Sequence, residues 1–88
     1  ILITDDEAFA AEVEQGIQAL LAKLGTGPTA RQSWDRHGVI ILVDDLAEAP
    51  ARADRLAAEH VELVVETPAA VIYAIRHAGS VFLGRHTP

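Results

Sequence analysis

At 88 residues, half of them hydrophobic, the chain can form one domain at most and would bury only about 60–65% of its unfolded surface. Thirteen Asp and Glu against seven Lys and Arg give a net charge of −6 with no clustered basic stripe, which argues against nucleic acid as a partner. The absence of cysteine excludes disulfides and thiolate metal sites, and no apolar run reaches the ~18 residues of a membrane span, so we expect a cytoplasmic protein without membrane contact.

The first part of the sequence predicts a strand, a long helix and a short helix. Residues 1–3 are strand-like, and Thr4 with Glu7 has the spacing of a capping box, so the long helix should begin near Thr4. Its predicted core positions recur at steps of three and four residues: Phe9, Val13, Ile17, Leu20, Leu21 and Leu24. The Gly-Thr-Gly-Pro run at 25–28 should end this helix, and a short helix over 29–37 should follow.

The middle of the sequence predicts a buried strand and a second long helix. Residues 39–43 are apolar throughout, as in a strand that is covered on both faces. The helix should start at Asp44-Asp45 or, because proline is favoured in a first turn, near Pro50. It should extend as far as Glu59-His60.

The last part predicts a strand over 61–66, a helix from Pro68 that stops at Gly79, and a buried strand over 80–83. Strands that alternate with amphipathic helices imply right-handed crossovers and parallel pairing. We therefore predict an α/β fold with three layers: a mainly parallel four-stranded sheet with helices on both faces, part of an incomplete Rossmann-like domain. The abrupt strand-like start leads us to expect that 1–88 is a single α/β domain or a domain fragment of a longer chain.

Two patterns have ordinary structural explanations. Gly25-x-Gly27 follows a helix and lacks a third glycine, so it indicates a turn and not a phosphate-binding loop. His37, His60 and His77 each lie near a predicted helix end before a strand, where three imidazoles could converge on a metal. A cation at a helix C-terminus is also favoured by the helix dipole, and we prefer that interpretation.

Glu59-His60 is the pair with the clearest catalytic potential, because it lies where a helix pattern meets a strand pattern. Neighbouring helical residues do not face each other, so the two side chains should not form a hydrogen-bonded dyad. Each would have to act on its own proton, histidine as a general base near neutral pH and glutamate by activating a water. A solvated helix end without catalytic function is the alternative.

Two blocks of the sequence make it similar to histidinol dehydrogenases. The first is Ala-Asp-Arg-Leu-Ala-Ala-Glu-His-Val-Glu-Leu at 53–63, and the second is Ile-Arg-His-Ala-Gly-Ser-Val-Phe-Leu-Gly at 75–84, followed by Thr87-Pro88. The family usually reads Ala-Asn-x-x-Ala-Pro-Glu-His-Leu-Glu and Asn-Ala-Gly-x-(Ile/Val)-Phe-Leu-Gly. The resemblance extends over nearly the whole chain and corresponds to the middle of a family member.

The resemblance implies a zinc- and NAD-dependent homodimeric enzyme that oxidises L-histidinol through L-histidinal to L-histidine with two NAD, the last step of histidine biosynthesis. His60 would be the proton acceptor and would also contact the substrate. Glu59 would activate the water that adds to the aldehyde. The family's zinc ligands match no residue of this chain, so the chain alone should hold no metal, and its NAD contacts are unassigned.

Three residues depart from the family pattern: Asp54 and His77 stand in place of Asn, and Ala58 in place of Pro. None of these changes removes a proposed catalytic group, although Ala58 loosens the approach to Glu59. The site should lie at the amino end of the strand that begins near Val61, which is unusual for an open α/β sheet. A non-catalytic α/β ligand-binding or interaction module is the alternative function.

Overall fold

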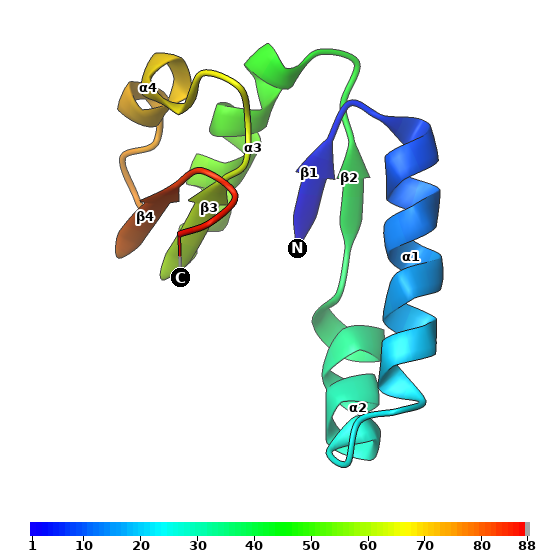
Figure 1. Ribbon diagram of the computed structural model, residues 1–88. Coiled ribbons are helices and arrows are strands. Elements are labelled where there is room, and N and C mark those ends of the chain that lie inside the picture. The colour runs from blue at the N-terminus through cyan, green and yellow to red at the C-terminus, as the bar shows by residue number, and fades with distance from the viewer. Residues whose placement is uncertain (88) are drawn as a thin grey trace. The chain divides into compact units, whose positions relative to one another are not determined.

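The computed structural model describes residues 1–87 and has an α/β fold (Figure 1). Its internal contacts divide the chain into two compact units, Ile1–Asp44 and Asp45–Pro88. Each unit contains one pair of parallel strands and its own helices.

The first unit contains β1 (Leu2–Thr4), α1 (Glu7–Leu21), α2 (Gly27–His37) and β2 (Ile40–Leu42). Strands β1 and β2 are parallel, with Leu2 opposite Ile40 and Thr4 opposite Leu42.

Asp6, and not Thr4, caps helix α1. The Asp6 carboxylate accepts a hydrogen bond from the Phe9 N–H at 2.9 Å, whereas Thr4 is buried in β1 and its hydroxyl oxygen accepts from the Asp6 N–H at 3.2 Å. Threonine therefore stabilises the turn before the helix, and the predicted capping box of Thr4 and Glu7 is wrong.

The glycine pair between α1 and α2 forms a turn, as predicted. A Cβ atom on Gly27 would lie 2.5 Å from the backbone oxygen of Leu21, the last residue of α1. Gly27 is buried and starts α2, with Pro28 in the first turn. Glycine is needed here because the two helices approach each other too closely for any side chain.

The second unit contains η1 (Leu46–Glu48), α3 (Ala49–Leu56), β3 (His60–Leu63), α4 (Pro68–Val71), η2 (Ile72–Ala74) and β4 (Ser80–Leu83). Asp45 and Glu48 form a capping box around the 3₁₀ turn η1, and Pro50 lies in the first turn of α3. Of the two predicted helix starts, the one near Pro50 is therefore correct for the regular helix.

Helix α3 ends earlier than predicted, at Leu56. Ala57 has a left-handed conformation with φ of 50°, and its N–H is bonded to the carbonyl oxygens of Ala53 and Asp54. This cap turns the chain away from the helix axis, so the predicted extension of the helix to Glu59-His60 is wrong. The helix predicted from Pro68 to Gly79 is also shorter, because it ends as a 3₁₀ turn at Ala74.

Strands β3 and β4 are parallel, with His60 opposite Ser80 and Leu63 opposite Leu83. The strands of residues 1–87 thus form two two-stranded sheets, and the predicted single four-stranded sheet is not present among them. Parallel pairing through crossover helices is correct for both pairs. The difference lies in the number of sheets, because the alternation of strands and helices does not specify which strands pair.

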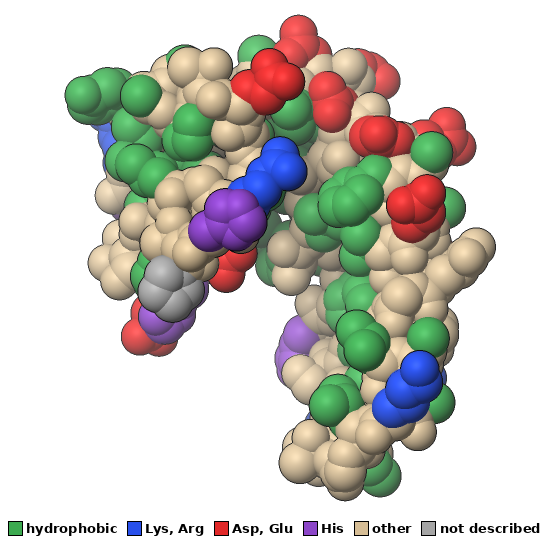
Figure 2. Space-filling model, viewed as in Figure 1, with side chains coloured by type: hydrophobic (Ala, Val, Ile, Leu, Met, Phe, Trp, Pro, Cys, Tyr) green, Lys and Arg blue, Asp and Glu red, His purple; other side chains and the backbone are tan. Residues whose placement is uncertain are grey.

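Many apolar side chains of both units remain exposed (Figure 2). Val43 is the one described apolar residue, glycine and proline aside, that is buried, with 6% of its surface exposed. Strand β2 is not covered on both faces, since Leu42 is half exposed, and Phe9, Leu20 and Leu24 of the predicted α1 core are exposed as well. Among residues 1–87, no helix is long and apolar enough to cross a membrane.

Candidate active-site segment

Glu59 and His60 lie at the amino end of β3, as the sequence predicts. A short connection from Ala57 to Glu59 separates α3 from β3, and His60 is the first residue of the strand. Both residues are exposed. His60 therefore does not end a helix, so the helix-dipole explanation offered for its position is wrong.

The segment that enters β4 holds the backbone of Glu59 on one side. The Ser80 N–H donates to the Glu59 carbonyl oxygen at 2.7 Å, and the Gly79 N–H donates to that of Ala58 at 3.3 Å. A Cβ on Gly79 would lie 2.8 Å from the Glu59 oxygen and 3.2 Å from its Cγ. The close approach requires glycine at 79 and fixes the position from which the Glu59 side chain starts.

The imidazole of His60 is supported by an aromatic ring. Its ring stacks on Phe82 of β4, with 5.8 Å between ring centroids and 22° between planes. Stacking orients the plane of the His60 imidazole and leaves the edge of that ring open. Within residues 1–87, neither nitrogen of this imidazole has a hydrogen-bond partner. An imidazole held in this way can accept a proton at an unpaired nitrogen.

The Glu59 carboxylate and the His60 imidazole are independent of each other. No hydrogen bond or ion pair joins them within the part of the chain described, although they are adjacent in sequence. His60 begins strand β3, whereas Glu59 lies in the bend before it. The arrangement suits two separate proton transfers better than one coupled acid–base pair.

Asp54 and His77 form a polar contact that was not predicted from the sequence. Asp54 of α3 accepts hydrogen bonds at one oxygen, Oδ1, from the Arg76 N–H at 2.6 Å and from the His77 N–H at 2.8 Å. Its other oxygen, Oδ2, lies 2.7 Å from His77 Nδ1. The Asp54 side chain is 19% exposed and that of His77 67%.

These contacts change the acidity of Asp54. The Arg76 N–H, followed by the His77 side chain, lowers the pKa of the Asp54 carboxyl below its ordinary value of 3.8. The contacts of Asp54 with Arg76 and His77 were hard to predict from the sequence, because the partners are 22 and 23 residues apart. Asp54 and His77 both depart from the family pattern, and this was the one indication in the sequence that the two residues are in contact.

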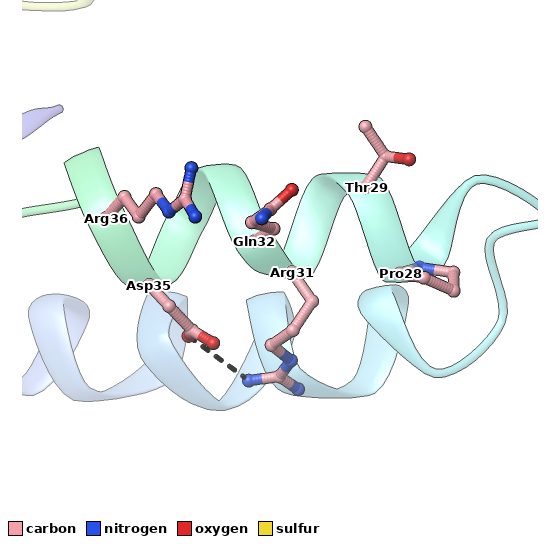
Figure 3. A pocket seen from close by; sticks show the side chains of 6 residues that line it. All are labelled: Pro28, Thr29, Arg31, Gln32, Asp35 and Arg36. Atoms are coloured by element: carbon pink, nitrogen blue, oxygen red, sulfur yellow. Dashed lines mark ion pairs between the residues drawn. The ribbon is translucent and has the colours of Figure 1, made fainter.

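Neither a zinc site nor a deep pocket is formed by the described residues. Residues 1–87 contain no group of three or more His, Asp or Glu side chains that could hold a metal ion, so they do not fit a zinc ion on their own. The groove in Figure 3 is lined by α2 alone, and the Arg31–Asp35 ion pair at 3.9 Å runs along its surface. A groove lined by one exposed helix encloses no ligand.

Comparison with known proteins assigns the family. The family model for histidinol dehydrogenase matches residues 1–88. The chain belongs to the histidinol dehydrogenase family. It is 52% identical to the histidinol dehydrogenase of Caulobacter vibrioides, 51% to that of Zymomonas mobilis and 52% to that of Rhodospirillum rubrum, over 100% of its own length in each case.

The chain spans about a fifth of the length of these histidinol dehydrogenases, 20% of each. The match of the family model and the identity to these enzymes confirm the family resemblance inferred from the two sequence blocks.

Proposed function

We propose that this chain is part of a histidinol dehydrogenase that oxidises L-histidinol through L-histidinal to L-histidine with NAD, and that it contributes two of the catalytic groups. The observation that carries the proposal is about 50% identity to histidinol dehydrogenases along the entire chain, with Glu59 and His60 in the matched region. In the intact enzyme we expect a cytoplasmic homodimer whose remaining chain covers the exposed apolar faces and extends the two strand pairs into larger sheets.

His60 is the proposed proton acceptor for the alcohol and a contact to the substrate. Oxidation of the alcohol to the aldehyde removes the hydroxyl proton and a hydride, and an unpaired nitrogen of His60 takes the proton. The stack on Phe82 supports this role because it orients the ring without occupying its nitrogens.

Glu59 is the proposed base for the second oxidation. The aldehyde must first add water, and the Glu59 carboxylate takes a proton from that water as its oxygen bonds to the carbonyl carbon. The hydrate anion formed in this way then loses a hydride to give the carboxylic acid, which releases its remaining proton to water and becomes the carboxylate. The lack of contact between Glu59 and His60 supports separate use of the two groups, because neither protonation state then controls the other directly.

NAD supplies the hydride acceptor for both oxidations when it is bound. The described residues offer no metal-ligand cluster of their own, and we assign no step on this chain to zinc. We expect residues from elsewhere in the intact enzyme to hold the zinc ion.

The test is to measure NADH formation from L-histidinol and, separately, from L-histidinal with the intact protein. His60→Ala should reduce both activities by a factor of 10² or more, in the range lost with a general base. Asp44→Ala is the control, because Asp44 is exposed and makes no hydrogen bond or ion pair within residues 1–87. Absence of histidinol oxidation by the wild-type protein would favour the non-catalytic module instead.

A further inference from the structure

We propose that Asp54 and His77 form a positioning pair that sets the backbone of Glu59 for the aldehyde oxidation. This inference rests on the proposed function, since it assigns the pair a role through Glu59. Neither residue is proposed to contact the substrate. Two connections join three short segments of the second unit.

The first connection is made by one carboxylate. Asp54 Oδ1 accepts from two consecutive backbone amides, at 2.6 and 2.8 Å, and Oδ2 contacts His77 Nδ1 at 2.7 Å. Within residues 1–87 these are the only side-chain hydrogen bonds that join positions more than four residues apart. Asp54 therefore provides the one side-chain link of this kind between α3 and the chain that enters β4.

The second connection follows directly along the chain. Two residues after His77, Gly79 approaches the Glu59 backbone closely, and the Ser80 N–H donates to the Glu59 carbonyl oxygen at 2.7 Å. The segment 76–80 is thus attached to Asp54 at one end and to Glu59 at the other. Asp54 itself lies in the last turn of α3, five positions before Glu59. Together with the chain from Asp54 to Glu59, these contacts form a closed loop around the Ala57 turn.

The closed loop of contacts through Asp54 and the segment 76–80 constrains Glu59 more than His60. The ladder partner of His60, Ser80, also belongs to this segment, but His60 has two further supports outside it. Its ring stacks on Phe82, and the strand that it begins stays paired with β4 as far as Leu63 and Leu83. Glu59 precedes the strand, and among the described residues its backbone is held by Gly79 and Ser80 of this segment, without a second support such as the Phe82 stack. Loss of the Asp54 contacts should therefore move or loosen Glu59 while leaving His60 in position.

The experiment compares Asp54→Ala with Asp54→Asn in the intact enzyme. Asp54→Ala should lower kcat for L-histidinal oxidation about tenfold with KM unchanged, because a misplacement of 1 Å can cost as much as 10² in rate. The oxidation of L-histidinol to the aldehyde should change less than threefold. Asp54→Asn should restore the aldehyde step, since the amide oxygen can still accept both backbone N–H groups.

Amide hydrogen exchange of residues 76–80 gives a readout that does not depend on activity. Asp54→Ala should speed exchange of this segment at least tenfold, and Asp54→Asn should not. The carboxylate-deletion control is again Asp44→Ala, for which we expect no change in either measurement. If Asp54→Ala does not fold, Asp54→Glu serves instead, because the added methylene displaces the carboxylate from the two amides.

The outcomes separate this inference from the proposed function. If Glu59→Gln slows the aldehyde step and Asp54→Ala does not, the positioning role is wrong and the proposed function stands. If Glu59→Gln has no effect, the proposed role of Glu59 fails, and unchanged exchange at 76–80 in Asp54→Ala would overturn the structural link as well. Equal loss of both oxidations in Asp54→Ala would show a general structural role and contradict the inference.

Discussion

Replacement of Gly79 by alanine should damage the Glu59 site by a steric effect that can be worked out from the structure. The added Cβ would lie 2.8 Å from the Glu59 carbonyl oxygen and 3.2 Å from its Cγ, whereas ordinary contact begins at 3.4 Å. One of the two segments must therefore shift by about 0.6 Å, and the 2.7 Å hydrogen bond from Ser80 to Glu59 must lengthen.

We expect Gly79→Ala to lower the free energy of unfolding by about 1–3 kcal/mol, as overpacked sites do, and to lower kcat for L-histidinal oxidation about tenfold. Urea denaturation and steady-state kinetics of the intact enzyme measure the two effects. Gly16→Ala is the matched control, because a Cβ at Gly16 in α1 meets nothing within 4 Å and alanine should stabilise the helix by ~0.5–1 kcal/mol. Wild-type stability and activity in Gly79→Ala would refute the steric argument.

Two further predictions concern stability. Ala57→Gly should raise the free energy of unfolding by about 0.5–1 kcal/mol in urea denaturation, because glycine adopts the left-handed φ of 50° without the cost that alanine bears; a loss of stability would contradict this. The second concerns pH. The folded-state pKa of Asp54 lies below its ordinary 3.8, so its carboxylate stabilises the fold above that pH and loses this effect as the pH falls through the folded-state pKa. The stability difference between wild type and Asp54→Asn should therefore shrink below about pH 4, and a pH-independent difference would argue against the contact.

Local sequence signals predicted much of the fold. The bounds of the strand at 80–83 and the end of the short helix at His37 agree closely with the structure, because proline, glycine and β-branched residues mark them. The strand is not buried as predicted, since Ser80 and Leu83 are exposed. Pro50 correctly indicated the start of α3. These elements depend on residues that are neighbours in sequence.

The errors arose where tertiary contacts outweigh local preference. Alanine is the best helix former, so Ala57 predicted a continued helix, yet it forms a left-handed cap. The helix predicted from Pro68 to Gly79 should have continued past Val71 and Ile72, but it changes to a 3₁₀ turn at these β-branched residues. Strand pairing across the two units was inferred from alternation alone, which does not specify which strands are adjacent.

The candidate site was predicted in part. The sequence located Glu59 and His60 at the amino end of a strand, and their independence followed from their adjacency. The Phe82 stack and the Asp54–His77 contact could not be read from the sequence, because each joins residues more than 20 positions apart that meet only in the folded unit. The catalytic roles themselves stay predictions.

The most direct test of the account is the number of hydrides transferred by Glu59→Gln of the intact enzyme in a single turnover with L-histidinol and excess NAD. If Glu59 serves the aldehyde oxidation and not the alcohol oxidation, the first equivalent of NADH should form at close to the wild-type rate and the second at least tenfold more slowly, with L-histidinal trapped in between. Equal slowing of both equivalents, or two equivalents at wild-type rates, would contradict the separation of roles.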